Sequence, residues 1–293
     1  MSFTNFCDKF KSLTPDVYNI IHNKGTELAG TGLFNLSDEY GTYICRGCGL
    51  ALFRSEHKFI ASCGWPSFDD EISGSIKRTA DQDGCRVEIL CNRCDGHLGH
   101  VFYGEQYTKN NLRHCVNSAS IEFVSCDLVA DTQEIIFAGG CFWGVEYFMH
   151  RQQGVLITQV GYTSGNIDYP KYDQVCNGTT NHIEAIRVVF NAEVLSFEEL
   201  TKLFLEIHDP YQVGGQGPDI GTQYVSAIFY YTMQQKLVAE SLLKQLEYGN
   251  GPVATIIRPV STFWPAEEYH QKYYNKSKQQ PYCHAYLKYF PTL

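Results

Sequence analysis

The chain has 293 residues, of which 44% are hydrophobic and 14% aromatic, so it is long and apolar enough to fill the cores of two domains. Its formal net charge is -9 and it has no run of lysine or arginine, which argues against nucleic acid or an anionic membrane as a partner. The sequence predicts neither a signal peptide nor a membrane span of about 18 apolar residues, so we expect a cytoplasmic protein whose 12 cysteines serve metal binding or catalysis rather than a disulfide scaffold.

The first predicted elements are a short helix and a mostly β domain. Apolar side chains between residues 13 and 21 have helical spacing, with Thr14 as a candidate cap and Pro15 at the first helical position. Strand-like segments separated by glycine, asparagine and aspartate turns follow at residues 43–44, 51–53, 87–90 and 121–124. This texture predicts a compact, mostly β domain that ends near residue 128.

Two C-x2-C pairs lie inside this β domain, Cys45 with Cys48 and Cys91 with Cys94. Each pair is short enough to present two thiolates to one tetrahedral ion. The 42 residues between the pairs exceed the usual zinc-ribbon spacing, so we expect the pairs to meet across the β fold. The hypothesis is one closed zinc site per chain, with two redox C-x-x-C pairs as the alternative. A closed site has no open coordination position, so this zinc would hold the fold and perform no chemistry.

Candidates for chemistry in the same domain lie in three segments: Cys63 in CGWPSF, the run HLGHVF from His97 to Phe102, and Cys115 in RHCVNS. Two thiols with two histidines and a tryptophan are typical of a cysteine nucleophile, imidazoles that move protons, and a second cysteine that closes a disulfide. Spacing alone does not show that the segments converge, and His97 and His100 could equally be core or surface residues.

The stretch GGCFWG at residues 139–144 follows an apolar run and contains the first candidate reactive residue of the second domain, Cys141. Strand, glycine turn and helical spacing predict that Cys141 lies at the first turn of a helix, where unpaired N–H groups and the dipole favour an anion. A thiol there loses its proton more easily, so Cys141 is a candidate nucleophile, with Phe142 and Trp143 as an apolar wall for a small hydrophobic group. The alternative is a buried structural cysteine in a glycine turn.

Strand-like and helical segments alternate through the rest of the second domain, which predicts an α/β fold. We expect strands at 134–138, 155–160, 183–190, 223–230 and 253–258, and helices at about 142–150, 196–207 and 232–247. Ser196 and Thr232 open the last two helices in capping boxes. Alternation in the third strand places Glu184 on an apolar face. Desolvation would raise its carboxyl pKa and make it a general acid; an edge carboxylate is the alternative.

The motifs of the first domain resemble those of a B-type methionine sulfoxide reductase. Both C-x2-C pairs, GWPSF, HLGHVF and RHCVNSAS occur in this order over nearly all of residues 13–125. The resemblance implies that Cys115 is the nucleophile and that Cys63 resolves it. It also implies a pocket lined by Trp65, His97, His100, Phe102 and Asn117. His114 departs from the tyrosine that is usual in the family at its position.

GGCFWG, with GYTSG, HDP, GTQY and AEEYHQKY further along, is similar to an A-type methionine sulfoxide reductase across residues 134–290. The resemblance implies that Cys141 attacks and that Glu184 donates a proton. Phe142 and Trp143 would hold the methyl group of the substrate. The polar side of the implied pocket consists of Tyr172, Asp219 and Tyr224, with Pro218 before Asp219 where asparagine is usual.

The recycling thiol of the second domain has two candidates. Cys283 lies in KQQPYCH, where glutamine, lysine and proline predict a mobile tail that can swing to Cys141. Cys176 is the alternative, because it is four residues from Tyr172.

Together, the two resemblances imply a fused reductase with an MsrB-like β domain at 1–128, a linker at 129–133, and a ferredoxin-like α+β sandwich at 134–293. By resemblance, the A-type half reduces the S epimer of methionine sulfoxide and the B-type half the R epimer. In each site a thiolate attacks the sulfoxide sulfur, an acid protonates its oxygen, and the resulting sulfenic acid condenses with a second cysteine. A thioredoxin-like protein would reduce the disulfide, the substrates would be oxidised proteins or free methionine sulfoxide, and no organic cofactor is expected.

Two other classes of function use the same cysteines. One is a zinc-knuckle interaction module fused to a thiol redox sensor, which would consume no methionine sulfoxide. The other is a thiol peroxidase, which would turn over hydrogen peroxide equally well and form no methionine. An assay on both epimers with dithiothreitol separates these classes.

Overall fold

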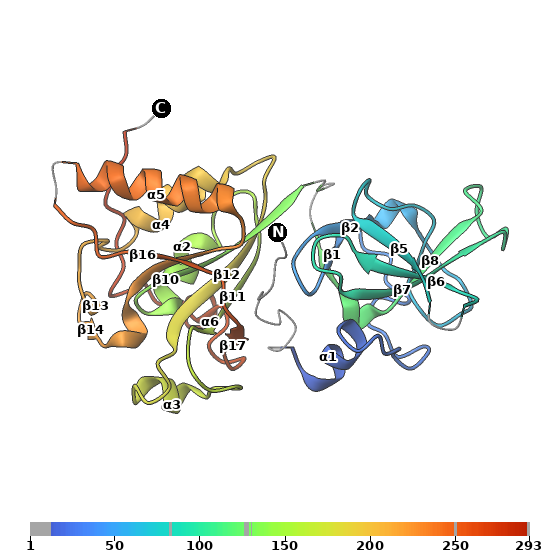
Figure 1. Cartoon of the computed structure of the whole chain (residues 1–293), viewed down its shortest axis with the longest axis horizontal. Helices are drawn as coiled ribbons and strands as arrows, with labels where there is room; N and C mark the ends of the chain where they lie inside the picture. Colours follow the sequence, from blue (N-terminus) through green and yellow to red (C-terminus); the bar gives the residue numbers. More distant parts are fainter. Residues whose placement is uncertain (1–12, 82–83, 126–128, 130, 249–250, 292–293) are drawn as a thin grey trace. The chain divides into compact units, whose positions relative to one another are not determined.

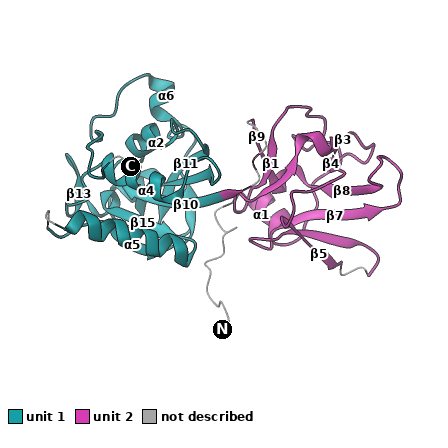
Figure 2. Ribbon diagram, turned by 90° about the horizontal axis from the view of Figure 1, so that it is seen from above, with its two compact units in different colours: residues 1–12, 133–293 teal, residues 13–132 magenta. Residues whose placement is uncertain are grey.

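The computed structural model describes residues 13–81, 84–125, 129, 131–248 and 251–291 (Figure 1). These residues form two compact units, one of residues 13–132 and one that begins at residue 133 (Figure 2). Cys7 and Cys126, to which the sequence assigns no role, lie outside the described residues, as does part of the predicted linker. None of the described helices has the length and apolar character needed to cross a membrane.

The N-terminal unit is mostly β, as predicted. Helix α1 (Pro15–Ile21) opens it at the expected proline, although the Thr14 side chain makes no capping hydrogen bond. A three-stranded sheet has the order β2 (Ala51–Arg54), β1 (Thr42–Cys45) and β9 (Ile121–Val124). A six-stranded sheet has the order β3 (Lys58–Phe59), β4 (Ser67–Phe68), β8 (Leu112–Val116), β7 (His97–Tyr103), β6 (Val87–Cys91) and β5 (Ile76–Ala80).

Aromatic side chains form the centre of this unit's core. Phe53 of β2 stacks on Phe68 of β4, with ring centroids 4.4 Å apart, and Tyr43 of β1 meets Phe68 edge-on at 5.0 Å. His114 of β8 packs against Phe53 and is fully buried. Because side chains alternate along a strand, the next residue, Cys115, projects from the opposite face of β8.

The C-terminal unit is built on a six-stranded mixed sheet. Its order is β16 (Ile256–Pro259), β15 (Ser226–Tyr230), β10 (Thr132–Gly139), β12 (Ile183–Asn191), β11 (Val155–Thr163) and β17 (Phe263–Pro265), and β16 lies parallel to β15. The helices are α2 (Phe142–Met149), α3 (Tyr172–Cys176), α4 (Phe197–Glu206), α5 (Met233–Glu247) and α6 (Tyr273–Ser277). A small hairpin, β13 (Gly215–Gln216) and β14 (Asp219–Ile220), precedes the turn of 3-10 helix at Thr222–Tyr224.

Local signals located most of these elements correctly. The Ser196 hydroxyl accepts the Glu199 N–H at 3.1 Å, and the Thr232 hydroxyl accepts the Gln235 N–H at 3.2 Å, so both predicted capping boxes are confirmed. The strand predicted from residue 253 begins only at Ile256. The N–H groups of residues 254 and 255 instead donate to the carbonyl of Pro210, at 2.8 and 3.2 Å.

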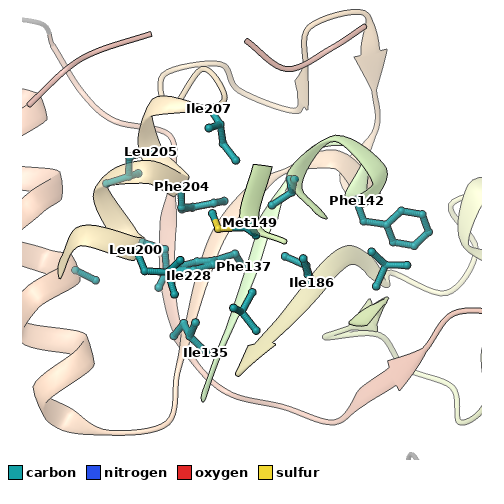
Figure 3. Packing of buried hydrophobic residues seen from close by; sticks show 14 of the residues in the cluster. Ile135, Phe137, Phe142, Met149, Ile186, Leu200, Phe204, Leu205, Ile207 and Ile228 are labelled. Carbon is teal, nitrogen blue, oxygen red and sulfur yellow. The ribbon is translucent and has the colours of Figure 1, made fainter. Parts of the chain in front are cut away.

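The core beside α4 holds the strand that leads to the reactive segment. Phe137 of β10 stacks on Phe204 of α4 with ring centroids 4.4 Å apart. Figure 3 shows Phe204 and Leu200 of α4 against Phe137 and Ile228 of the sheet, all of them fully buried. This packing fixes β10, so the Gly139–Gly140–Cys141 turn leaves the sheet at one defined place.

Candidate active sites

Four cysteine sulfurs of the N-terminal unit meet at one point. Cys45 and Cys94 have their Sγ atoms 3.6 Å apart, those of Cys48 and Cys91 lie 3.5 Å apart, and all four lie within 4.8 Å of one another. Four thiolates at about 2.3 Å from a tetrahedral zinc ion would lie about 3.8 Å apart, so the cluster fits this ion. The predicted meeting of the two pairs across the β fold is confirmed.

The two knuckles that carry these cysteines have the same backbone design. In the first, the Cys45 N–H donates to the Leu50 carbonyl and the Gly49 N–H donates to the Cys45 carbonyl. In the second, the Cys91 N–H donates to the Gly96 carbonyl and the Asp95 N–H donates to the Cys91 carbonyl. Gly49 and Asp95 both have positive φ, 71° and 57°, which turns each chain back after its second cysteine. Each knuckle therefore presents its thiols without help from the other.

The sulfur atoms of Cys63 and Cys115 lie 4.0 Å apart. Their approach depends on strand pairing, because Ser67 of β4 lies opposite Cys115 of β8. Cys63 also contacts the Trp65 carbonyl at 3.5 Å and the Ser67 hydroxyl at 3.6 Å. The HLGHVF segment lies on β7, the other neighbour of β8, where His100 is opposite Cys115. The structure thus brings together all three segments that sequence spacing could not join.

The two thiols of this pair differ in acidity. Burial opposes ionisation of Cys63, but hydrogen bonding with the Trp65 backbone and the Ser67 side chain and the charge of Arg113 outweigh it and lower the pKa of Cys63. Burial, together with the neighbouring Cys63, raises the pKa of Cys115 to about 12. In the resting pair the negative charge is therefore held by Cys63 before Cys115.

Arg113 is held by a carboxylate that the sequence analysis did not single out. Its guanidinium donates twice to Glu105, at 2.7 and 2.9 Å, and lies 4.5 Å from the centroid of the Phe102 ring. The arrangement aims a fixed positive charge at the two thiols. The sequence did not predict the pairing of Arg113 with Glu105. Glu105 lies eight residues earlier, in the turn between β7 and β8, and the two residues meet only because these strands pair.

Both histidines of HLGHVF have carboxylate partners. His97 Nδ1 lies 2.7 Å from Glu88, whose other oxygen accepts a 2.7 Å hydrogen bond from Lys24. His100 Nε2 lies 2.7 Å from Asp81. His97 is buried, and its Nε2 has no hydrogen-bond partner among the described residues. Burial lowers the pKa of His97, so this nitrogen presents a lone pair.

Trp65 and Asn117 are joined through a loop that the sequence did not mark. The Trp65 indole donates to the Glu27 carbonyl at 3.1 Å, while Asn117 accepts the Glu27 N–H at 3.0 Å. The Asn117 amide also donates to the Leu98 carbonyl at 3.2 Å. Asn117 is buried and thus holds the loop at Glu27, to which the Trp65 indole is hydrogen-bonded.

In the C-terminal unit, Cys141 is the N-cap residue of α2 and is 7% exposed. Glu184 of β12 lies beside it and is 2% exposed, and its carboxylate accepts the Phe142 N–H at 3.1 Å. Burial, reinforced by Cys141, raises the pKa of Glu184 well above its usual range. The predicted position of Cys141 and the predicted burial of Glu184 are both confirmed.

The expectation of an acidic Cys141 thiol is wrong for the resting site. A hydrogen bond with Cys283, and then burial, raise the pKa of Cys141 well above its ordinary value. The N–H of Trp143 acts in the opposite direction, as a helix N-terminus should, but it is outweighed. Cys141 is therefore a thiol at rest.

Tyrosine hydroxyls and Asp219 surround the two reactive groups. Burial raises the pKa values of Tyr172 and Tyr224, so both remain O–H donors. Asp219 accepts hydrogen bonds from the Tyr282 hydroxyl at 3.0 and 3.1 Å. The polar side expected from the resemblance is thus present, with Tyr282 as an additional member.

The apolar side is formed by aromatic rings around His270. Trp143 stacks on Tyr273 with centroids 3.8 Å apart, and its indole N–H donates to His270 Nδ1 at 3.1 Å. The His270 ring also lies 5.2 Å from Phe142 and 4.5 Å from Tyr172. In the sequence, His270 stands out only as part of the motif AEEYHQKY.

The tail that carries Cys283 is docked, which corrects the expectation of a mobile segment. Glu206 at the end of α4 accepts hydrogen bonds from the Tyr286 hydroxyl and from the N–H groups of Tyr289 and Phe290, at 2.8 to 2.9 Å. Cys283 thereby lies against Cys141 without a swing of the tail. Cys176 is half-buried and contacts the Tyr172 hydroxyl instead.

Comparison with known proteins divides the chain at the same place as the fold. The family model described as peptide methionine sulfoxide reductase matches residues 133–291, and the SelR domain model matches residues 13–125. The peptide methionine sulfoxide reductase MsrA of Methanococcus maripaludis is 42% identical over 149 residues, which are 50% of this chain and 95% of that protein. MsrA of Thermus thermophilus is 44% identical over 148 residues, 50% of this chain and 84% of that protein.

A solved structure agrees with the C-terminal unit. The crystal structure of reduced Mxr1 from Saccharomyces cerevisiae is 34% identical in sequence. It superposes with a TM-score of 0.51 over 54% of this chain and 94% of that chain. The fold of this unit is therefore similar to that of Mxr1.

Proposed function

Because the chain belongs to the peptide methionine sulfoxide reductase family through residues 133–291 and carries a SelR domain before it, it reduces methionine sulfoxide, and we propose that each unit reduces one epimer. The C-terminal unit would take the S epimer and the N-terminal unit the R epimer, in accord with one enzyme per epimer. Protein-bound and free methionine sulfoxide are both proposed substrates, and the cytoplasm is the proposed compartment.

One observation carries the proposal for the C-terminal unit: a carboxylic acid that is 2% exposed lies beside a cysteine at a helix N-terminus. The Cys141 sulfur attacks the sulfoxide sulfur while the protonated Glu184 gives its proton to the sulfoxide oxygen, and the proton of the Cys141 thiol returns to the Glu184 carboxylate. The sulfur–oxygen bond breaks, methionine leaves, and Cys141 is left as a sulfenic acid. Phe142 and Trp143 pack against the methyl group, and the hydroxyls of Tyr172 and Tyr224, with Asp219, face the oxygen.

Cys283 then condenses with the sulfenic acid and releases water. The docked tail supports this role, because a disulfide needs Cα atoms within about 7 Å and Cys283 already contacts Cys141. The new disulfide has to be reduced by an external thiol, and we propose a thioredoxin-like protein as the partner.

The N-terminal unit follows the same logic with its own residues. We assign attack to Cys115 and resolution to Cys63, whose sulfur lies 4.0 Å away. His97 and His100, each oriented by a carboxylate at 2.7 Å, would exchange protons with the substrate oxygen. Trp65 and Phe102 provide apolar walls, and Asn117 braces the loop under Trp65.

The cysteines Cys45, Cys48, Cys91 and Cys94 would hold one zinc ion, which supplies folding energy and takes no part in the reaction. Cys48 and Cys91 are fully buried in the core of this unit, and without an ion only weak sulfur–sulfur hydrogen bonds, of 3.5 and 3.6 Å, would join the two knuckles. No organic cofactor is proposed.

The experiment that tests the function supplies each epimer separately, with dithiothreitol as reductant, and measures methionine formed. We expect both epimers to be consumed, S by the C-terminal unit and R by the N-terminal unit. A redox sensor would form no methionine, and a thiol peroxidase would consume hydrogen peroxide equally well. Either of these results would replace the proposal.

A further inference from the structure

A histidine without an assigned role lies against Cys283 in the C-terminal unit. His284 is 6% exposed; its Nδ1 lies 3.1 Å from the Cys283 sulfur and its Nε2 lies 2.7 Å from the Gly139 carbonyl oxygen. Because a carbonyl oxygen only accepts hydrogen bonds, Nε2 carries the proton of the ring. The neutral ring therefore presents the Nδ1 lone pair to the Cys283 thiol.

From this geometry we infer that His284 is the general base that removes the proton of Cys283 when the disulfide with Cys141 forms. The inference rests on the proposed function, because it requires Cys141 as a sulfenic acid. The Cys283 thiolate attacks the Cys141 sulfur, and a sulfur–sulfur bond forms as the sulfur–oxygen bond breaks. The Cys283 sulfur is oxidised and the Cys141 sulfur reduced. The departing hydroxide takes the proton from His284 and leaves as water.

The reactive segment is shaped to admit this ring. A Cβ atom at Gly144 would lie 2.1 Å from His284 Nδ1, so any larger residue would push the imidazole away. A Cβ atom at Gly140 would instead clash with the Gln216 side chain, at 2.5 Å, and would lie in ordinary contact with His284, at 3.7 Å. Gly144, three residues after Cys141, thus leaves room for the base of the next step.

The surroundings of His284 keep its ring neutral, so Nδ1 has a lone pair that can accept a proton. Burial lowers the pKa of His284 to about 4, so the ring is neutral at physiological pH. The titratable groups that face it are Cys283 on its own segment, Asp219 of β14, and His208 after α4. Burial also lowers the pKa of His208, to about 3, so His208 adds no positive charge. Asp219 favours the imidazolium that forms when Cys283 gives up its proton.

The test is a single turnover of the reduced full-length protein with free L-methionine S-sulfoxide and no reductant. Methionine, dimedone-trapped Cys141 sulfenic acid and the Cys141–Cys283 disulfide are measured over time. His284→Gln can still donate to the Gly139 carbonyl but has no base beside Cys283. We expect methionine release within about twofold of wild type, disulfide formation slowed by about 10²-fold at pH 7, and trapped sulfenic acid at Cys141. His284→Asn should give the same pattern.

The pH dependence separates a base from a packing residue. At pH 9 the disulfide defect of His284→Gln should shrink, because hydroxide takes over removal of the thiol proton. His150→Gln, at the other end of α2, is the matched control and should behave as wild type. Disulfide formation at the wild-type rate, or a defect of equal size at pH 7 and pH 9, would overturn the inference. Normal recycling by Cys283→Ser would overturn both the role of His284 and the proposed recycling role of Cys283. A wild-type protein that releases no methionine would contradict the proposed function itself.

Discussion

The sulfur of Cys63 lies 4.0 Å from the sulfur of Cys115, although 51 residues separate the two cysteines in the chain. A disulfide has a bond length of about 2.05 Å, so the two sulfurs have to approach by about 2 Å to form one. Cys63 lies four residues before Ser67 of β4, which is opposite Cys115 of β8. Strand pairing therefore already holds the two thiols close to each other for resolution of a sulfenic acid in the N-terminal unit.

The first prediction assigns the roles of this pair. Cys115→Ser should abolish reduction of the R epimer, whereas Cys63→Ser should release about one methionine per site before it stalls. Reduction of the S epimer by the same preparations is the control. The resting pKa values favour a thiolate at Cys63, so the alternative assignment has Cys63 as the nucleophile and Cys115 as the resolving thiol. A Cys63→Ser protein without activity, beside a Cys115→Ser protein with one turnover, would exchange the two roles.

The second prediction concerns the cysteine cluster. Metal analysis should find about one zinc per chain, bound by the four sulfurs. Cys48→Ser or a strong chelator should unfold the N-terminal unit and abolish R-epimer reduction, because metal binding in such a site is folding energy. Reduction of the S epimer should persist, since the C-terminal unit has its own core. A folded Cys48→Ser protein that reduces the R epimer with no metal bound would disprove the site.

The third prediction tests Glu184 as the acid. Glu184→Gln keeps an oxygen for the Phe142 N–H but has no proton to give, so S-epimer turnover should fall by about 10² to 10⁴-fold. The raised pKa of Glu184 means that the acid form is present below that pKa and is lost as the pH rises through it. Wild-type S-epimer activity should therefore decline on the alkaline side.

The matched control for Glu184 is Glu198→Gln, an exposed carboxylate at the start of α4 that pairs with Lys202. This variant should keep full activity on both epimers. If Glu184→Gln turns over the S epimer at the wild-type rate, another group supplies the proton.

The fourth prediction concerns a half-buried carboxylate of the N-terminal unit. Glu71 accepts hydrogen bonds from Arg78 at 2.8 Å and lies 2.6 Å from His114 Nε2. Burial opposes its ionisation, but His114 and Arg78 outweigh burial and lower the pKa of Glu71 to about 2. Its stabilisation is therefore present above the ordinary carboxyl pKa of about 4.3 and is lost as the pH falls toward 2.

The measurement for Glu71 compares the wild type with Glu71→Gln by hydrogen exchange of the β8 peptide. The variant should exchange faster at pH 7. The difference should narrow below about pH 4.3, where the unfolded chain takes up the proton, and vanish near pH 2, where folded Glu71 is protonated as well. Equal exchange at pH 7 would show that the network does not stabilise β8.

The fifth prediction identifies the recycling thiol of the C-terminal unit. Peptide mapping of the oxidised protein should find Cys141 joined to Cys283, and Cys283→Ser should recycle slowly with thioredoxin. Cys176→Ser should recycle normally, because Cys176 is hydrogen-bonded to Tyr172, whereas the hydrogen-bond partner of Cys141 is Cys283. A disulfide between Cys141 and Cys176 would transfer the role to Cys176.

Short-range patterns in the sequence were sufficient for the elements and for part of each site. The capping boxes at Ser196 and Thr232 were readable because their hydrogen bonds span only three residues. The burial of Glu184 was readable because alternation along a strand is a local property. The resemblance added the roles of residues, which no local pattern contains.

Only the tertiary structure decided the acidity of the thiols and the state of the tail. Cys141 has the helix N-terminus that the sequence predicted, yet the contact with Cys283 raises its pKa. The tail has the composition of a mobile segment, yet Glu206 binds it through three hydrogen bonds. A pKa depends on burial and on charges that arrive from distant segments, and a tail docks only if a partner surface exists. Neither the pKa of a thiol nor the docking of the tail is determined by the few residues next to it in the sequence, so both are decided only when the chain has folded.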